Sequence, residues 1–296
     1  MIPLRTSLRI FPRALVRGVT TWSEAPASQP AALKLKTGES FTGRSFGAPH
    51  SVFGETVFTT SITSYPESLT DPSYTGQLLA FTQPLIGNYG VPDNSRPGSA
   101  REHPLDVDVG CFLESKGVKA AGVIVSELCE RFSHFQAYES LASWCARYQV
   151  PGIQGVDTRA LTTLLRNQGS TLGAILVGED AKRTPAQDEF IDPMSENLIA
   201  KMSTPEPYTL HPAIGAEKAS AHVALLDFGS KANILRSLLR LGVSVTVLPW
   251  NTDFNLIRDQ FDGLFLSNGP GSPNIVPEAV ATVSYTHLRA HETEAD

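Results

Sequence analysis

The sequence predicts a protein of mixed α/β and α+β class, in which a β-rich N-terminal domain precedes an incomplete α/β domain built on a parallel sheet. Two observations support this prediction. From residue 33, short runs rich in β-branched and aromatic residues alternate with turns, which is typical of a β-rich fold. From residue 221, the pattern changes to strand, helix, strand, helix and strand, the order expected for a parallel sheet with covering helices.

The predicted elements of the first domain begin with a hairpin around Thr37-Gly38, where apolar and polar residues alternate on both sides. Residues 55–65 predict a strand, and residues 77–90 predict a further strand pair. The prolines and glycine of residues 66–76 predict a loop between them.

Two helices are expected at the end of this domain. One covers SLASWCARYQV and the other VDTRALTTLLRNQG, which Asp157 or Thr158 starts and Gly169 ends. The first should turn one apolar face inward, composed of Leu141, Trp144, Cys145 and Tyr148.

The second domain should open with a buried strand and a helix that Ser230 caps and Gly242 closes. A second strand, a helix and a third strand that runs into a glycine loop should follow. In order, these elements are VALLDFG, SKANILRSLLRLG, VSVTVLPW, TDFNLIRDQFD and GLFLSNGPGSP.

Composition excludes several classes of protein. The chain has 296 residues, a net charge of −6, 41% hydrophobic and 18% charged residues, which is typical of globular rather than disordered proteins. It has no apolar run near the ~18 residues that a membrane-spanning helix needs. A mildly acidic chain also lacks the basic face of most nucleic-acid-binding proteins, so neither a membrane nor a nucleic acid is expected as a partner. Three cysteines cannot form a disulfide framework and indicate a reducing compartment.

The N-terminus has the composition of an organellar transit peptide. Its first 23 residues contain four arginines, at positions 5, 9, 13 and 17, and no acidic residue. The membrane potential of a mitochondrion draws such positive charge inward. We therefore expect a mitochondrial matrix protein, with a cytoplasmic location and a disordered, solvated tail as the alternatives.

The C-terminus breaks the pattern that precedes it. Val283 to Thr293 match the in-frame translation of a transposon-based sequencing adapter, so the natural gene product should leave this chain near Thr282. His287 and His291 are four residues apart and on a helix could share a metal. Because both lie in the adapter-like stretch, we reject this interpretation and expect no metal ligands.

Two loops could carry chemistry. Gly269-Pro270-Gly271 directly follow an apolar strand, where ligands bind in open α/β sheets, and glycines let the backbone approach an anion. An ordinary tight turn is the alternative. Ser73 in LTDPSYTG is either a ligand-binding hydroxyl or a turn hydroxyl. The cysteines lack the small flanking residues of a nucleophile elbow and are interpreted as packed thiols; they are Cys111, Cys129 and Cys145.

Longer stretches of the chain resemble a known family. The segments GETVFTTSITSYPESLTDPSYTGQLLAFTQPLIGNYGVP and GIQGVDTRALTTLLRNQG resemble the N-terminal domain of the carbamoyl-phosphate synthase small chain. VALLDFGSKANILRSLL and DGLFLSNGPGSP resemble the start of its class I glutamine amidotransferase domain. Together with the basic N-terminus, the segments GRSFGAP and YPESLTDPSYTG are most similar to those of fungal, arginine-pathway, mitochondrial members.

The resemblance implies a glutaminase subunit. In this family the small chain releases ammonia from L-glutamine and passes it to a large subunit, which makes carbamoyl phosphate from bicarbonate and ATP. Ser73, Gly269 and Gly271 match positions that bind glutamine. No cofactor is expected in this chain, since ATP and magnesium belong to the large subunit.

This chain departs from the family in one respect. The family's nucleophilic cysteine lies in a Gly-x-Cys-Leu-Gly elbow after the glycine loop, with its histidine and glutamate further on, and none of these is present here. A non-catalytic docking module, or the first piece of a fused multifunctional pyrimidine-pathway synthase, are therefore alternatives. The expected division is 1–30 transit peptide and flexible start, 31–183 small-chain N-terminal domain, 184–220 linker, 221–282 first part of the amidotransferase domain, and 283–296 adapter-derived residues.

We predict that the purified 296-residue polypeptide does not hydrolyse glutamine, because it contains no elbow cysteine to attack the side-chain amide. Ammonia release can be followed with a coupled glutamate dehydrogenase assay. Cysteine-dependent release above the buffer rate would contradict the prediction.

Overall fold

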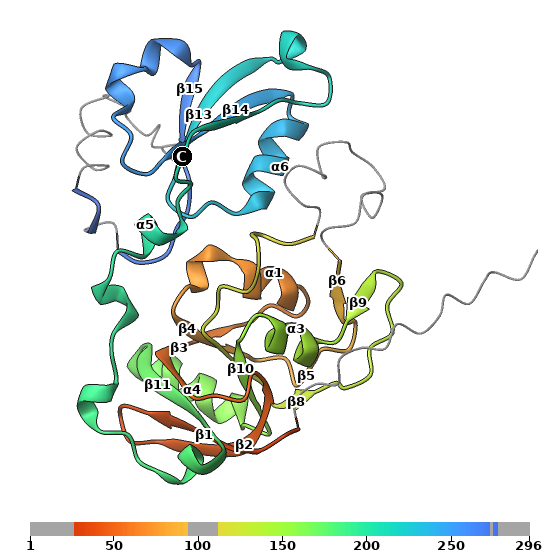
Figure 1. Cartoon of the computed structure of the whole chain (residues 1–296), viewed down its shortest axis with the longest axis vertical. Helices are drawn as coiled ribbons and strands as arrows, with labels where there is room; N and C mark the ends of the chain where they lie inside the picture. Colours follow the sequence, from red (N-terminus) through yellow and green to blue (C-terminus); the bar gives the residue numbers. More distant parts are fainter. Residues whose placement is uncertain (1–26, 94–111, 273–274, 278–296) are drawn as a thin grey trace, which may run out of the picture.

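A computed structural model describes residues 27–93, 112–272 and 275–277, which form a barrel body and an α/β body (Figure 1). The predicted transit peptide up to residue 26, Cys111 and the adapter-like tail lie outside the described residues. The described part confirms the predicted fold class, since a β-rich body precedes a mostly parallel sheet with one covering helix.

The barrel body is a closed sheet in the order β1-β11-β3-β4-β7-β10-β2. The predicted hairpin is present as the antiparallel pair β1 and β2, with Gly38 in the turn at φ 110°. The strands are β1 (Pro30–Leu35), β2 (Ser40–Gly47), β3 (Val52–Thr59), β4 (Gln77–Phe81), β7 (Gly122–Ile124), β10 (Pro151–Gln154) and β11 (Thr171–Val177).

The prediction of a strand pair within residues 77–90 was wrong. β4 lies parallel between β3 and β7, whereas β5 (Leu85–Ile86) pairs with β8 (Glu127–Leu128) in a separate small sheet. Four of the five residues of β4 are buried, and burial on both faces favours the middle of a parallel arrangement over a hairpin. A further small sheet pairs β6 (Val91–Pro92) with β9 (Ala137–Glu139).

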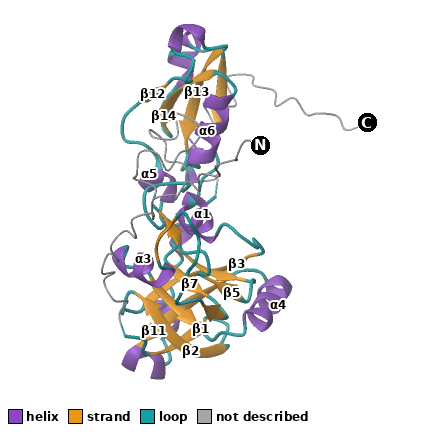
Figure 2. Ribbon diagram, turned by 90° about the vertical axis from the view of Figure 1, so that its right-hand side faces the viewer, coloured by secondary structure: helices purple, strands orange, loops and turns teal. Residues whose placement is uncertain are grey.

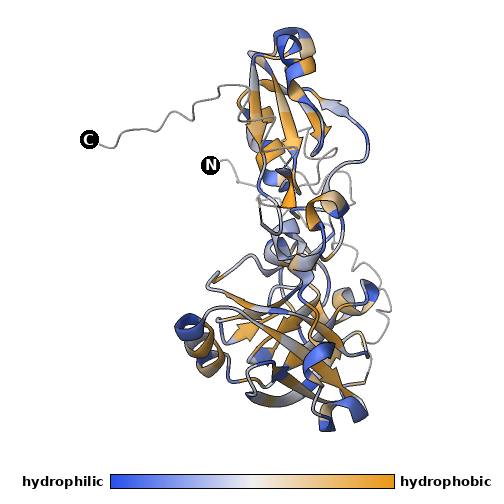
Figure 3. Cartoon of the chain, turned by 90° about the vertical axis from the view of Figure 1, so that its left-hand side faces the viewer, coloured by the Kyte–Doolittle hydropathy of each residue, from blue (hydrophilic) through white to orange (hydrophobic). Residues whose placement is uncertain are grey.

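Alternate residues of the barrel strands serve two hydrophobic clusters. Leu78 and Ala80 of β4 pack with α4 (Thr158–Gln168), whereas Leu79 and Phe81 pack with α1 (Tyr65–Thr70) and α3 (Leu141–Arg147). This period of two is the expected consequence of strand geometry. Figure 2 shows α3 and α4 on different sides of the barrel strands, and Figure 3 shows that the strands of both bodies are largely hydrophobic.

The prediction of a loop over residues 66–76 was wrong, since α1 and a short 3₁₀ turn occupy most of this segment. The boundaries of α3 and α4 follow the predicted signals closely. The Asp157 side chain accepts from the Ala160 N–H at 2.8 Å, and Gly169 is the C-cap of α4. In α3 the expected inward face is buried at Leu141, Trp144 and Cys145, but Tyr148 is 40% exposed. The prediction for Tyr148 was wrong: this residue is the C-cap of α3, and its ring lies at the surface beside the Arg147 guanidinium.

The α/β body contains four strands in the order β12-β14-β13-β15. β13 is parallel to both β14 and β15, and α6 (Ala232–Arg240) packs against β14. Where the sequence predicted a second helix, the chain forms two short 3₁₀ turns, η6 (Phe254–Leu256) and η7 (Arg258–Gln260). Phe254 is buried and packs with Ile257 and Phe261. The apolar residues that predicted an α-helix are therefore buried by two short turns instead. The strands are β12 (Tyr208–Leu210), β13 (Ala221–Asp227), β14 (Val243–Pro249) and β15 (Gly263–Leu266).

The segment predicted as a linker is built into both bodies. Phe190 packs edge-to-face on Phe53 of β3, with ring centroids 5.7 Å apart, and β12 adds an antiparallel edge strand to β14. The sequence did not predict this ordered structure, because the segment contains only short elements and therefore has weak hydrophobic periodicity. These elements are η3 (Gln187–Glu189), η4 (Pro193–Ser195), α5 (Leu198–Met202), β12 and η5 (Ala216–Lys218), and η2 (Gly178–Lys182) precedes the segment. None of the helices in the described ranges is long and apolar enough to cross a bilayer.

We predict that Gly152→Ala destabilises the barrel body, because a Cβ at this position would lie 2.3 Å from Cζ of the buried Phe46 ring. Overpacking of this kind lowers the free energy of unfolding by about 1–3 kcal/mol. Urea unfolding would measure the loss. The matched control is Gly263→Ala, where the nearest atom to the new Cβ is 3.8 Å away; equal stability of the two variants would contradict the packing argument.

Candidate functional site

The two bodies meet at a group of loops that we call the interdomain seam, composed of Asp71, Ser73, Lys231, Asn268 and Gly269. Ser73 lies in the short 3₁₀ turn η1 (Pro72–Tyr74) that follows α1, and Asp71 is the N-cap of this turn. Lys231 precedes α6, and Asn268 and Gly269 follow β15. Figure 1 shows α1 at the end of the barrel body that faces α5 and α6.

Ser73 is held from both sides of the seam. Its N–H donates to Oδ1 of Asp71 at 2.9 Å, which fixes the turn by a local side-chain cap. Its Oγ accepts from Nδ2 of Asn268 at 2.9 Å, although the two residues are 195 positions apart in the chain. The serine hydroxyl thereby lies beside the glycine loop of the α/β body.

An ion pair spans the same seam. Nζ of Lys231 lies 2.6 Å from Oδ2 of Asp71, which is buried, while Lys231 is 40% exposed at its side chain. Burial alone would lower the pKa of Lys231, but the hydrogen bond and the negative charge of Asp71 outweigh it and raise that pKa above its usual value. The ammonium group therefore stays charged at neutral pH.

The glycine loop is packed too closely for other residues. A Cβ at Gly269 would lie 2.0 Å from the carbonyl oxygen of Phe228, and Gly271 has a φ of 82°. Gly229, with a φ of 111°, brings Pro270 and Pro72 together, since a Cβ there would lie 2.9 Å from Cδ of the former and 3.3 Å from Cβ of the latter. These glycines let backbone from both bodies approach to contact distance.

The backbone N–H groups of Gly269 and Gly271 donate to no other group in the described residues. Ser267 fixes the loop instead, since its Oγ accepts from the Phe228 N–H at 2.9 Å and donates to the Asn268 carbonyl at 2.8 Å. The loop can therefore offer backbone donors to a bound anion or carbonyl oxygen.

Helix α6 takes its N-terminal cap from the barrel body. Ser230 was predicted to cap it, but the Ser230 N–H donates to Asp227, and the helix starts at Ala232 with no side-chain cap of its own. The Glu114 carbonyl accepts from the Ala232 N–H at 2.8 Å and its Oε2 from the Asn233 N–H at 2.9 Å.

Arg236 of α6 completes this contact. Its Nη1 donates to the Leu113 carbonyl at 3.0 Å and its Nη2 lies 3.6 Å from Oε1 of Glu114. Both side chains are largely buried, so the pair holds α6 against the barrel body.

The predicted site residues are only partly brought together. Ser73 and Gly269 meet at the seam through Asn268. Gly271 is exposed, and a Cβ there would lie 3.9 Å from Sδ of Met194. Sequence reasoning missed Asp71, Lys231, Asn268 and Glu114. Asp71 and Asn268 lie within the two motifs, a signal that could have found them. Glu114 has no such signal, because its contacts with α6 join residues more than 100 positions apart.

The described cysteines are not placed for chemistry at the seam. Cys145 is fully buried in α3, and burial raises the pKa of its thiol. Sγ of Cys129 donates to the Arg131 carbonyl at 2.9 Å. Across the residues with described positions, no group of three or more His, Cys, Asp or Glu side chains could hold a metal ion.

Two family models match the chain. The model for the CPSase domain of the carbamoyl-phosphate synthase small chain matches residues 33–175, and that for class-I glutamine amidotransferase matches residues 224–289. The first range contains the barrel strands apart from the ends of β1 and β11, and the second begins within β13.

Fungal relatives match most of the chain. The arginine-specific carbamoyl phosphate synthase small chain of Chaetomium globosum is 47% identical over 90% of this chain and 55% of its own length. Those of Aspergillus niger and Neurospora crassa are 48% and 45% identical over 86% of this chain, and 53% and 54% of their own lengths. The chain thus spans about half the length of these relatives.

Among solved structures, an aminopeptidase from Aneurinibacillus sp. strain AM-1 aligns with a TM-score of 0.28 and 13% identity, over 75% of this chain and 52% of that one. A similarity this low supports no argument about fold or function.

We predict that Glu114→Ala loosens the seam, because α6 loses its side-chain cap and Arg236 loses its carboxylate. Loss of a cap lowers stability by about 1 kcal/mol, and protease cleavage between α5 and β12 should become faster. Glu217→Ala, at an exposed position on η5, is the control. Identical cleavage rates for both variants and the unmodified chain would show that the cap does not hold the bodies together.

Proposed function

Because this chain belongs to the carbamoyl-phosphate synthase small-chain family, we propose that it is part of the glutaminase subunit of a glutamine-hydrolysing carbamoyl-phosphate synthase. In this proposal the seam holds L-glutamine, the ammonia source, through Ser73, Gly269 and Gly271. The hydrogen bond between Asn268 and Ser73, 2.9 Å long, carries the proposal, because it joins the two motifs into one polar site.

The chemistry of the seam suits an amino-acid ligand. Since Oγ of Ser73 accepts from Asn268, its own proton is available to donate to a carbonyl or carboxylate oxygen. The glycine loop adds backbone N–H donors, which bind oxyanions strongly when aimed at developing negative charge. Lys231 adds positive charge. Asp71 contacts the ammonium group on one side only, so the other side can face a ligand.

Each residue therefore has a distinct part in binding. Ser73 positions the ligand by hydrogen bonding, and Asn268 and Asp71 hold Ser73 in place. Gly269 keeps the glycine loop close to Phe228, so that the backbone N–H groups of the loop can bind the ligand. Hydrolysis itself would split the side-chain amide of glutamine into glutamate and ammonia, with water as the co-substrate.

The names of the relatives favour the arginine pathway over the pyrimidine pathway, since those reported above are all described as arginine-specific. We further propose that a large subunit is the partner and receives the ammonia, and that it uses bicarbonate, ATP and magnesium, which this chain does not bind. The acid-free, arginine-bearing N-terminus supports a mitochondrial matrix location.

We predict that the chain binds L-glutamine and that Ser73→Ala weakens this binding about tenfold, the loss expected for one hydrogen bond of about 1.4 kcal/mol. Gly269→Ala should remove binding, because the new Cβ collides with the Phe228 carbonyl. Isothermal titration calorimetry measures both, with Ser40→Ala, an exposed serine on β2, as the control. Equal affinities of Ser73→Ala and Ser40→Ala would overturn the assignment of Ser73.

A further inference from the structure

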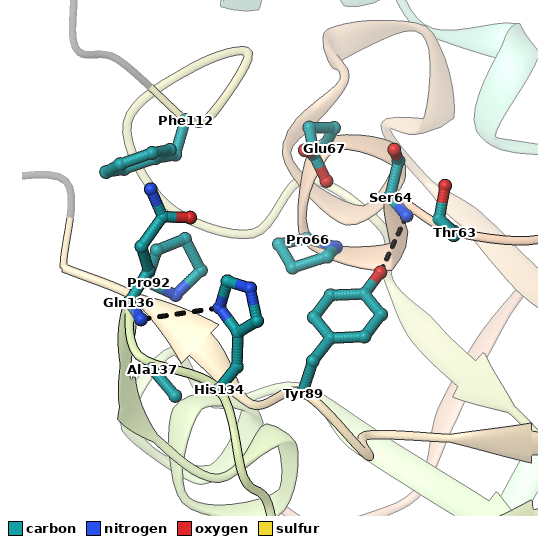
Figure 4. Close-up of a pocket in the computed structure, with 10 residues that line it drawn as sticks. All are labelled: Thr63, Ser64, Pro66, Glu67, Tyr89, Pro92, Phe112, His134, Gln136 and Ala137. Carbon is teal, nitrogen blue, oxygen red and sulfur yellow. Dashed lines mark hydrogen bonds between the residues drawn. The ribbon is translucent and has the colours of Figure 1, made fainter. Parts of the chain in front are cut away.

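A cavity lies on the barrel body, at the other end of α1 from the seam. It has a volume of about 290 Å³ and lies between the start of α1 and the segments that hold β6 and β9. In Figure 4, the Glu67 carboxyl lies on one side of this cavity and the rings of Tyr89 and His134 on the opposite side, while the Phe112 ring lies across the cavity from Tyr89. We call it the Glu67 pocket.

Glu67 brings an unsatisfied negative charge to the pocket. Its Oε2 is buried and has no hydrogen-bond partner within the part of the chain that the structure describes. Burial raises the pKa of this carboxyl, and its own backbone N–H only partly opposes that rise. A buried carboxylate oxygen without a donor is destabilising, so the pocket favours a ligand that brings hydrogen-bond donors and positive charge.

Among the residues that the structure describes, no lysine or arginine lines the pocket to meet this need. Arg236 is close enough to lower the pKa of Glu67, but it is the weakest of the influences on that group, and its guanidinium already contacts the Leu113 carbonyl and Glu114.

The aromatic side of the pocket is rigid. The Tyr89 hydroxyl accepts from the Ser64 N–H at 2.6 Å and the Tyr65 N–H at 3.2 Å, and the Tyr89 and Tyr65 rings stack with centroids 4.3 Å apart. These bonds hold Ser64 at a φ of 70°, a conformation that serine rarely adopts. Nδ1 of His134 accepts from the Gln136 N–H at 3.3 Å, which fixes one edge of the imidazole ring. Aromatic faces opposite a carboxylate are a setting that attracts cations.

Two exposed apolar residues adjoin lining residues of the pocket in the chain. Ile62, which precedes the lining residue Thr63, is 73% exposed, and Phe135, which follows His134, is 80% exposed. Exposed apolar side chains beside a charged pocket are typical of surfaces that bind another protein, whereas a small ligand would leave both side chains uncovered.

We propose that the Glu67 pocket receives a lysine or arginine side chain of the large subunit, with Ile62 and Phe135 packing against the surface around that side chain. The identity of the partner rests on the function proposed above. The positive head group pairs with the carboxylate of Glu67, and the aliphatic stem lies against the rings of Tyr89 and Phe112. The pocket thereby fixes the small chain on its partner through the body that does not carry the glycine loop.

Binding of the full chain to the large subunit from the same genome tests this proposal, measured by biolayer interferometry. Glu67→Gln keeps the shape of the side chain and removes its charge, and we expect about a tenfold weaker complex. Phe135→Ala should also weaken the complex, by about threefold to tenfold. The controls are Glu179→Gln and Leu256→Ala, which alter side chains that are 91% and 81% exposed elsewhere, and circular dichroism checks that every variant is folded.

The outcomes separate the two proposals. If the unmodified chain does not bind the large subunit, the proposed partnership is wrong. If it binds and Glu67→Gln and Phe135→Ala bind as tightly as their controls, the partnership stands and the pocket assignment is wrong. If free L-arginine or L-lysine binds the chain alone and Glu67→Gln removes that binding without weakening the complex, the pocket is a small-molecule site and the docking proposal is wrong.

Discussion

Helix α6 has no N-terminal cap of its own, and the Glu114 backbone and carboxylate from the other body supply one. Unpaired N–H groups at a helix start are destabilising when they are buried, and a carboxylate there also meets the positive end of the helix dipole. This one contact fixes where α6 begins and which surface of the barrel body it faces. Lys231, immediately before the helix, is thereby brought to Asp71, and the loop after β15 is brought to Ser73.

Close approach across the seam depends on residues without side chains. Gly269 allows the loop to pass the Phe228 carbonyl, and Gly229 allows Pro270 and Pro72 to pack together. Because the distances leave no space for a Cβ, the ligand-binding donors and the serine hydroxyl share one site only while these positions remain glycine. The Lys231–Asp71 ion pair and the Glu114 cap of α6 then hold the two bodies in the close contact that the glycines allow.

One crossover connection serves both sites of the barrel body. β3 and β4 are parallel, so the chain between them must cross from one end of the sheet to the other, and it does so through α1 and η1. Ser64 and Glu67 at the start of α1 line the docking pocket, and Asp71 and Ser73 after its end form the seam. Oγ1 of Thr70, in the last turn of α1, accepts from the Glu114 N–H at 3.0 Å, which ties this connection to the helix cap as well. Docking and glutamine binding are therefore proposed for opposite ends of one short helix.

The sequence by itself determined the class of fold, the hairpin at Gly38, the limits of α4 and the two motifs around Ser73 and Gly269, because caps, turns and periodicity depend on neighbouring residues. It also supported the family, which follows from long stretches of similarity. Only the tertiary structure decided that β4 lies between β3 and β7, that the segment before β12 is ordered, and that Glu114 caps α6. These features depend on partners distant in the chain, and local patterns carry no information about which distant groups will meet. The Ser73–Asn268 bond has the same origin: each residue type was visible in its loop, but their contact arises only when two separately folded bodies pack together.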